Sequence, residues 1–239
     1  RDLRMSRGLG DVYKRQIREN VQKLQEIKSK SSLICRKMSE FKQFNLSSIL
    51  EQLGEERTKK ILSSFVCPLN EDVQDFCRTK AIEFSKRGFA QTYLIYWQEG
   101  AEKEFIGYYT IAMKHFSVNK KQLSNKLFSR VRQHGTYDVS TGEYIISAPL
   151  IAQLGKNFDK GNDTLISGSE ILQMSIDRIR NIQREIGGKF FYLECEEKEK
   201  LIQFYEKNNF VPFGKRKLDK DETNLEGTYL MQLLQYREK

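Results

Sequence analysis

The apolar and polar positions of this chain follow two periods, one typical of strands and one typical of helices. Short apolar or alternating runs predict strands, and longer stretches with apolar residues three or four apart predict amphipathic helices. The two kinds alternate from residue 65 onward, which favours an α/β fold with helices flanking a mixed sheet. The predicted strands are 65–68, 92–97, 105–113, 144–154, 189–196, 211–213 and 228–234, and the predicted helices are 71–86, 119–133, 168–186 and 197–208.

Residues that start and stop helices support two of these predictions. Asn70 can accept a backbone hydrogen bond at the start of one helix, and Gly88 follows the end of that helix. Ser167 and Glu170 have the spacing of a capping box, and Gly187 ends the long helix that they begin. The remaining connections are predicted to be a hairpin turn at 98–101 and a polar loop at 135–143.

A proline interrupts the predicted strand 144–154. Pro149 cannot donate a hydrogen bond to a neighbouring strand, and proline within sheets occurs mainly at edges and bulges. We therefore predict a β-bulge between Pro149 and Ala152. A bulge leaves backbone groups unpaired, and such groups can bind an extended ligand.

The N-terminal quarter of the chain differs from the rest. Residues 1–16 have no hydrophobic period and resemble a translated adapter, so we interpret them as a non-native sequence scar. Residues 17–64 are predicted to form a helical extension: one or two charged helices over 17–44, then short helices after Asn45 and over 55–64. We expect this extension to pack on a main domain at 65–236 or to mediate self-association.

Composition favours a cytoplasmic protein that does not enter a membrane. Only 38% of the 239 residues are hydrophobic, and no apolar run approaches the length needed to cross a bilayer. The start of the sequence also lacks the pattern of a signal peptide. The cysteines lack a C-x-x-C spacing, so we expect reduced, buried thiols at Cys35, Cys67, Cys77 and Cys195.

The formal net charge of +9 is unevenly distributed. Residues 70–239 carry 26 Lys and Arg against 24 Asp and Glu, so the predicted catalytic domain is close to neutral. The excess lies in the N-terminal segments and in the predicted helix 119–133. This distribution weakens a general nucleic-acid interpretation but leaves open that a local basic face steers an RNA substrate. That face would consist of Lys120, Lys121, Lys126, Arg130 and Arg132.

The sequence lacks the signatures of several classes of enzyme. His115 and His134 have no third ligand at a useful spacing, which disfavours a metal site. Neither a Walker loop nor the G-x-G-x-x-G pattern of dinucleotide binding is present, and no nucleophilic triad stands out.

The loop and helix beginning near Ser167 offer a different chemistry. A helix N-terminus after a strand presents free backbone N–H groups, which bind phosphate. The alternative is an ordinary capped helix, because the carboxylate of Glu170 already interacts with the helix dipole. Tyr205, one helix later, is either a core residue or a proton donor to a thiolate. The ordinary pKa of a thiol, about 8.5, is close to the tyrosine value of about 10, which suits such a transfer.

The order of predicted elements over about 65–236 resembles the GCN5-related N-acetyltransferases, whose fold is a mixed, mostly antiparallel sheet flanked by helices. Three segments match the family's motifs. Ile151-Ala-Gln-Leu-Gly155 is similar to the bulged strand that binds pantetheine, and Asp163-Thr-Leu-Ile-Ser-Gly168 lies on the pyrophosphate loop. Leu201-Ile-Gln-Phe-Tyr-Glu-Lys-Asn-Asn-Phe210 is similar to the L-x-x-F-Y-x-x-x-G-F ending, which places Tyr205 on the tyrosine that often protonates the departing thiolate.

The pyrophosphate loop departs from the family's Q/R-x-x-G-x-G/A pattern. Asp163 replaces the usual Gln or Arg, Ile166 replaces the first glycine, and Asn209 replaces the glycine before the final phenylalanine. Backbone amides can still bind a pyrophosphate, provided that the side chain of Ile166 points away. The resemblance implies cofactor-binding residues at Gln153, Leu154, Gly155, Ile166, Ser167, Gly168, Ser169 and Lys198, the last at a position often held by asparagine.

This resemblance implies an acyl-CoA-dependent N-acyltransferase that moves the acetyl group of acetyl-CoA to a primary amine by direct attack. Tyr205 is the expected general acid, and the candidate bases are Glu143, Glu194 and Glu196. The acceptor remains open among a protein N-terminus, a lysine, a polyamine, an antibiotic and an aminoacyl-tRNA. Two alternatives are a toxin-like acetyltransferase of aminoacyl-tRNA and a non-catalytic module that senses coenzyme A or binds a partner protein.

Overall fold

A computed structural model of the chain describes residues 41–218 and 227–237. The chain divides into two units, the first formed by residues 1–42 and 98–102 and the second by residues 43–97 and 103–239. In the first unit, the described residues include a turn in which the side-chain amide of Gln98 donates to the carbonyl of Gly100 at 3.4 Å. The sheet described below belongs almost entirely to the second unit.

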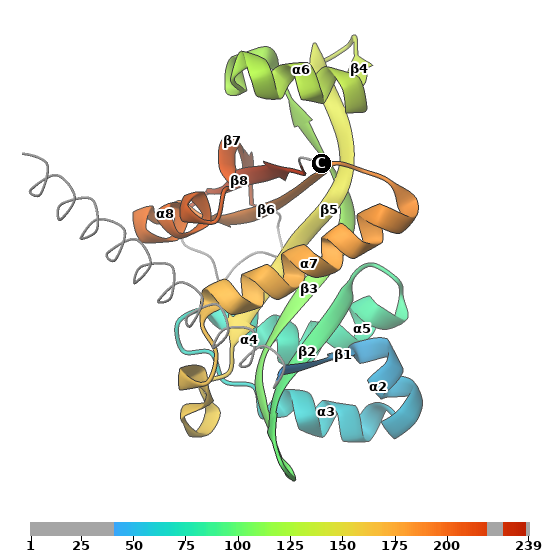
Figure 1. Cartoon of the computed structure of the whole chain (residues 1–239), viewed down its shortest axis with the longest axis vertical. Coiled ribbons are helices and arrows are strands. Elements are labelled where there is room, and N and C mark those ends of the chain that lie inside the picture. Colours follow the sequence, from blue (N-terminus) through green and yellow to red (C-terminus); the bar gives the residue numbers. More distant parts are fainter. Residues whose placement is uncertain (1–40, 219–226, 238–239) are drawn as a thin grey trace, which may run out of the picture. The chain divides into compact units, whose positions relative to one another are not determined.

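The described residues form an eight-stranded sheet with the order β1-β2-β3-β5-β6-β8-β7, and β4 pairs with β5 (Figure 1). β5 and β6 are parallel, whereas β5 is antiparallel to β3, and β8 is antiparallel to both β6 and β7. The mixed, mostly antiparallel sheet is therefore confirmed. The strands are β1 (Phe41–Asn45), β2 (Gln91–Glu99), β3 (Glu102–Val118), β4 (Thr136–Asp138), β5 (Glu143–Lys156), β6 (Phe190–Glu196), β7 (Val211–Lys217) and β8 (Tyr229–Tyr236).

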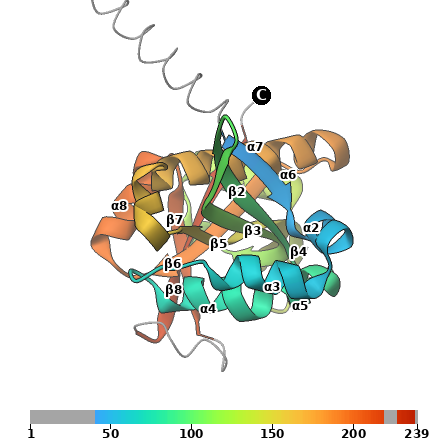
Figure 2. The ribbon, with the colours of Figure 1, turned by 90° about the horizontal axis from the view of Figure 1, so that it is seen from below.

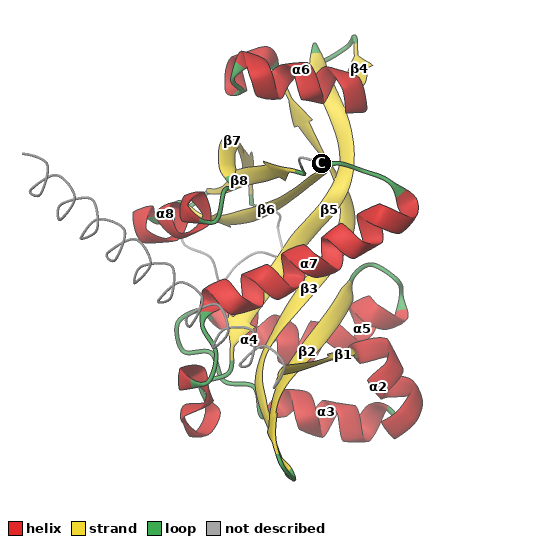
Figure 3. Cartoon of the chain, in the orientation of Figure 1, coloured by secondary structure: helices red, strands yellow, loops and turns green. Residues whose placement is uncertain are grey.

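The helices flank this sheet, as Figure 3 shows. The first predicted helix of the main domain forms but contains a π-helical turn, Phe76–Lys80, between α4 and α5. The basic insertion forms a 3-10 turn, Lys120–Gln122, followed by α6, and a further 3-10 segment, Asp159–Thr164, precedes α7. The α-helices are α2 (Leu46–Leu53), α3 (Glu55–Ser63), α4 (Glu71–Asp75), α5 (Ala81–Lys86), α6 (Asn125–His134), α7 (Gly168–Ile186) and α8 (Glu199–Lys207).

Adjacent residues of β3 point to opposite faces of the sheet and show which helices cover each face. A Cβ on Gly107 would lie 2.9 Å from Cδ1 of Ile171, so α7 covers that face. The next residue, Tyr108, donates from its hydroxyl to the carbonyl of Val73 at 2.6 Å, so α4 covers the other face. Figure 2 shows the strands lying between α7 on one side and α3, α4 and α5 on the other.

Strand directions explain why α7 and α8 share a face. β5 and β6 are parallel, and β6 and β7 also run in the same direction because both are antiparallel to β8. The two crossovers, through α7 and then α8, proceed in the same direction across the sheet. Since such crossovers are right-handed in nearly all proteins, both helices are placed on one side.

Two apolar clusters stabilise the described part of the chain. One lies under α2 to α5 and includes Leu46, Leu62, Phe65 and Tyr108, none of which is exposed to solvent. Helices α2 and α3, which we assigned to an N-terminal extension, therefore contribute to the same cluster as the residues that follow them. The other cluster joins α6 to the sheet and contains Phe116, Val118, Leu127, Val131, Ile146, Ala148, Phe190, Tyr192, Phe213 and Leu234.

Three predictions of local structure are wrong. Residues 65–68 are not a strand, because the Val66 amide donates to the side chain of Asn157 at 2.9 Å and the Val66 carbonyl accepts from the Phe158 amide at 2.8 Å. Residues 41–44 belong to β1 instead of a charged helix, and the polar loop 135–143 contains β4. The predicted helices of residues 17–40 and the scar 1–16 lie outside the described residues. The boundary at residue 65 stays a prediction.

Candidate functional site

The predicted bulge is present in β5 and marks the centre of the candidate site. Thr110 of β3 is paired with Gln153 and the next residue, Ile111, is paired with Ile151, so Ala152 is the extra residue. Pro149 lies three residues before it, opposite Met113 and in regular register. The bulge falls within the interval that the sequence predicted, at Ala152 and not at the proline itself.

Beyond the bulge, β5 and β6 separate. Within the described residues, their parallel ladder consists of the pairs Leu150–Tyr192 and Ile151–Leu193. After these pairs β5 continues along β3 to Lys156, while β6 continues along β8. In the described part of the chain, the backbone of residues 152–156 therefore has no strand partner on its β6 side, which leaves an open edge inside the sheet.

The three predicted pantetheine-binding residues lie on this edge. The side-chain amide of Gln153 donates to Oδ2 of Asp72 at 2.9 Å, which ties β5 to the first turn of α4. Leu154 is half-buried opposite Tyr109. A Cβ on Gly155 would lie 2.5 Å from Cγ1 of Val73, so only glycine fits at this position.

A buried asparagine holds the loop that leaves β5. The side chain of Asn157, 1% exposed, accepts from the amides of Val66 and Asp159 and donates to the carbonyl of Phe105 at 2.7 Å. Further along the loop, the Lys156 ammonium donates to the carbonyl of Asp163 at 3.0 Å. These polar contacts thus fix the path of the loop that leads from β5 to the start of α7.

The predicted pyrophosphate-binding residues lie at the N-terminus of α7. Ile166 is buried, so its side chain points away from solvent, as the family resemblance requires. Ser167 and Glu170 form the predicted capping box: the Ser167 amide donates to Glu170 Oε2 at 2.7 Å, and the Glu170 amide donates to Ser167 Oγ at 3.2 Å. The amides of Gly168 and Ser169 have no acceptor among the described residues and remain available to an anion.

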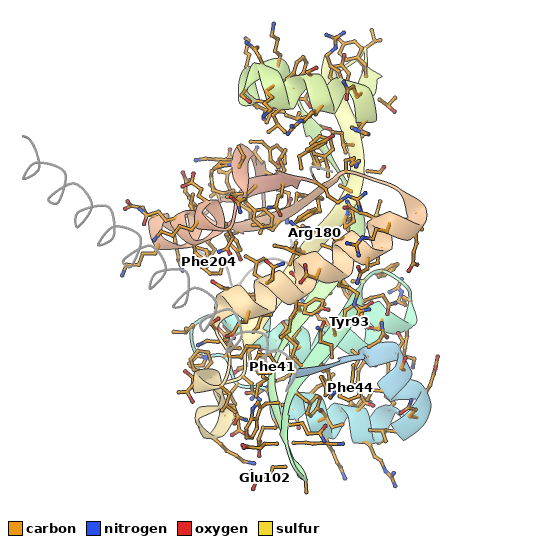
Figure 4. All side chains as sticks on the ribbon, viewed as in Figure 1. Phe41, Phe44, Tyr93, Glu102, Arg180 and Phe204 are labelled. Carbon is orange, nitrogen blue, oxygen red and sulfur yellow. The ribbon has the colours of Figure 1, made fainter. Side chains whose placement is uncertain are left out.

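The start of α7 is in contact with α8, which carries Tyr205. A Cβ on Gly168 would lie 3.7 Å from Cζ of Phe204, and Figure 4 labels this phenylalanine on α8. The ring of Phe204 packs edge-on against Tyr205 with centroids 5.1 Å apart, and the Tyr205 ring in turn packs against Phe210. Two motifs that lie about 40 residues apart in the sequence therefore form one site.

The side chain of Tyr205 lies in an apolar setting. Burial raises the pKa of Tyr205 well above its ordinary value, and the neighbouring Cys195 thiol adds a smaller increase. Among the described residues, no group forms a hydrogen bond with this hydroxyl. It therefore keeps its proton at physiological pH and can donate it to a ligand.

The charged candidates do not gather around Tyr205. Lys198, just before α8, pairs with Glu196 through Nζ and Oε2 at 3.2 Å. Glu194 accepts from the Arg216 guanidinium at 2.6 Å and from the Gln232 side chain. Glu143 lies at the opposite end of β5, roughly 40 Å along the strand from Gly155.

Sequence reasoning missed Asp72 and Asn157, which fix Gln153 and the loop after β5. It included Phe204 in the L-x-x-F-Y motif but did not place it against the start of α7. The only signal for Asp72 and Asn157 was their polar character, because Gln153 lies 81 positions after Asp72 and Val66 lies 91 positions before Asn157. In the described ranges no three His, Cys, Asp or Glu residues are placed to hold a metal, and no helix has the length and apolar character needed to cross a membrane.

Comparisons with known proteins identify the fold. No protein-family model and no curated protein matches the sequence. A tyrosine-to-phenylalanine mutant of KacT is 11% identical with a TM-score of 0.53, covering 82% of this chain and 95% of its own. AtaT complexed with acetyl-methionyl-tRNAfMet is 15% identical with a TM-score of 0.53, covering 80% and 93%. AtaTR bound with AcCoA is 14% identical with a TM-score of 0.48, covering 83% and 94%.

At these identities the comparisons concern the fold alone. The eight-stranded sheet, the bulge in β5 and the crossover through α7 agree with that assignment. The described part of the chain has the GCN5-related N-acetyltransferase fold, as its sequence motifs indicated.

Proposed function

We propose that this protein is an N-acetyltransferase that uses acetyl-CoA as its acyl donor. The observation that carries the proposal is the open edge of β5 beside the N-terminus of α7. Pantetheine has amide groups that can pair with the backbone of residues 153–155, and the free amides of Gly168 and Ser169 suit the pyrophosphate. Lys198 is a further candidate for the nucleotide portion.

Tyr205 is the proposed general acid of this reaction. The amine nitrogen of the acceptor attacks the thioester carbonyl, and the carbon–sulfur bond breaks. The Tyr205 hydroxyl donates its proton to the departing sulfur, which leaves as the thiol. The proton lost by the acceptor nitrogen passes through water and restores the hydroxyl, so the products are an amide and coenzyme A. The hydroxyl enters each cycle protonated, as this role requires, while burial raises its pKa and so makes it a weaker acid than an ordinary tyrosine.

The proposal is tested by calorimetry with acetyl-CoA together with a thiol-release assay on a panel of amines. We expect binding of acetyl-CoA and release of thiol with at least one amine. Binding without release on every amine would favour a non-catalytic module that senses coenzyme A. A lack of binding would reject both interpretations.

An aminoacyl-tRNA is the acceptor favoured by a specific observation. AtaT, which shares this fold at a TM-score of 0.53, has been captured with acetyl-methionyl-tRNAfMet. The basic insertion 119–133 of this chain supports the same class of acceptor, since RNA carries a dense negative charge. A direct comparison of aminoacyl-tRNA with lysine peptides and polyamines tests it: transfer to the tRNA should be faster and should fall steeply with salt.

A further inference from the structure

A large basic cavity lies away from the proposed acetyl-CoA site. It has a volume of about 920 Å³ and is bordered by α6, the C-terminal half of α7, the starts of β6 and β7 and the end of β8. None of the described residues that line it is acidic. Its cationic residues, which we call the α6–α7 basic pocket, are Lys126, Arg130, Arg180, Arg184, Lys189 and Arg237.

Contacts at the C-terminal end of β8 hold two of these cations, Arg130 and Arg237, in place. The backbone amide of Arg237 donates to the carbonyl of Lys189 at 2.7 Å, and the guanidinium of Arg237 lies 3.4 Å from the carbonyl of Arg180. The guanidinium of Arg130 stacks over the ring of Tyr236 at 4.3 Å. The pocket is thus built on the ends of β6 and β8 and differs from a set of unconnected surface lysines.

Among the described residues, little negative charge lies beside Lys126, Arg180, Arg184 and Lys189. The guanidinium of Arg184 donates to the neutral side chain of Asn181 at 2.8 Å, and Arg180 lies 3.7 Å from the partly exposed Asp177. Among the described residues, no carboxylate lies within 4 Å of the ammonium groups of Lys126 and Lys189. Like charges held together in a concave surface attract a polyanion, and planar guanidinium groups suit phosphate oxygens.

The position of the pocket limits the size of its ligand. Arg180 is twelve residues beyond Gly168 on the same helix, which corresponds to about 18 Å along its axis. Figure 4 labels Arg180 on α7 and Phe204 on α8. A small amine that reaches the thioester cannot also reach these arginines. A ligand that uses both places must span about 18 Å and carry several negative charges, as a nucleic acid does.

We propose that the α6–α7 basic pocket binds the phosphodiester backbone of an RNA acceptor. This inference rests on the proposed function, because the RNA is taken to carry the amine that is acetylated. Phosphate contacts of this kind set the position of the RNA without reading its sequence. The pocket therefore supplies affinity and orientation, and the amine end of the RNA enters the acetyl-CoA site.

The test uses the full chain and deacylated tRNA as the probe, measured by fluorescence anisotropy over a range of salt concentrations. The variant Lys126→Glu/Arg184→Glu reverses two exposed charges of the pocket. The matched control Arg57→Glu/Lys60→Glu makes the same change in net charge on α3. We expect the affinity of the pocket variant for tRNA to fall at least about tenfold. The slope of log K against the logarithm of the salt concentration should become less steep by about two, whereas the control variant keeps the affinity and the slope of the unaltered chain.

Equal affinity and equal salt slope in the pocket variant and the unaltered chain would overturn the proposal. So would a polyglutamate peptide that binds as tightly as tRNA and loses its binding in the same variant, because the pocket would then be a site for acidic protein. If Lys126→Glu/Arg184→Glu fails to fold in a thermal unfolding assay, Lys126→Gln/Arg184→Gln gives the same test with a smaller change.

Thiol release separates failure of this inference from failure of the proposed function. With a small amine as acceptor, the pocket variant should release thiol at the rate of the unaltered chain, whereas transfer to aminoacyl-tRNA should fall at least about tenfold. A chain that releases no thiol with any acceptor refutes the proposed function. In that case, the binding measurement with deacylated tRNA still tests whether the α6–α7 basic pocket binds RNA.

Discussion

Gly168 and Phe204 lie in contact, although 36 positions separate them: a Cβ built on Gly168 would be 3.7 Å from Cζ of Phe204. This contact joins the first turn of α7, with its two free amides, to the helix that carries Tyr205. The proposed anion site at the start of α7 and the proposed proton donor on α8 therefore lie next to each other.

Replacing Tyr205 with phenylalanine should lower turnover and leave the affinity for acetyl-CoA nearly unchanged. The change removes one hydroxyl and preserves the ring contacts with Phe204 and Phe210. A general acid contributes about 10²–10⁴ in rate, so kcat should fall at least about a hundredfold. Steady-state thiol release and calorimetry measure the two quantities. The exposed Tyr137→Phe is the control, and unchanged turnover in Tyr205→Phe would remove Tyr205 from the mechanism.

Gly155→Ala should destabilise the fold next to the bulge. The new methyl group would meet Cγ1 of Val73 at 2.5 Å and Cζ of Phe65 at 3.1 Å, in a cluster that is already packed. Overpacking of this kind costs about 1–3 kcal/mol, to be measured by urea denaturation. Gly168→Ala is the matched control, because its methyl group makes only an ordinary contact. Equal losses in both variants would contradict the steric explanation.

Asn157→Ala should lower the free energy of unfolding more than most substitutions of a single polar residue do. The side chain bridges Val66, Asp159 and Phe105, and its removal leaves buried backbone groups unpaired. We expect a loss of about 2–4 kcal/mol in the free energy of unfolding. The exposed Asn181→Ala should change stability by less than about 0.5 kcal/mol. A loss below about 1 kcal/mol for Asn157→Ala would mean that water replaces the missing contacts.

Cys195 should resist alkylation in the folded protein. Burial raises the pKa of its thiol to about 12, and Glu196 adds to the increase. Only the thiolate reacts, and its fraction rises with pH, so at pH 8 roughly one thiol in ten thousand is reactive. Mass spectrometry after iodoacetamide treatment should show modification of Cys195 in denaturant alone. An exposed cysteine, Ser129→Cys, is the positive control; equal modification of the two in the folded protein would contradict the prediction.

Local signals predicted the elements whose partners are close in the sequence. The capping box of Ser167 and Glu170 spans three positions, and Asn70 caps its own helix, so both could be recognised without tertiary structure. The bulge between Pro149 and Ala152 was predictable from one residue type, because proline cannot donate to a ladder, although Pro149 itself keeps the regular register opposite Met113. These features depend on the chemistry of single residues and their immediate neighbours.

Features that depend on distant partners could not be predicted. Residues 65–68 have the composition of a strand, but Asn157, 91 positions after Val66, binds their backbone instead. The basic pocket is a similar case: its six cations come from α6, α7, the start of β6 and the end of β8, and only two of them lie in the insertion that the sequence indicated.

By itself, then, the sequence determined most of the elements after residue 70, the bulge, the capped helix start and the resemblance to an acetyltransferase. Tertiary structure alone decided that Gly155 must be a glycine, that α7 and α8 share a face and that Gly168 meets Phe204. The physical reason is the separation in sequence between the residues that interact. Caps and bulges arise from hydrogen bonds within a few residues, whereas steric contacts and charge clusters exist only after the sheet has brought distant segments together.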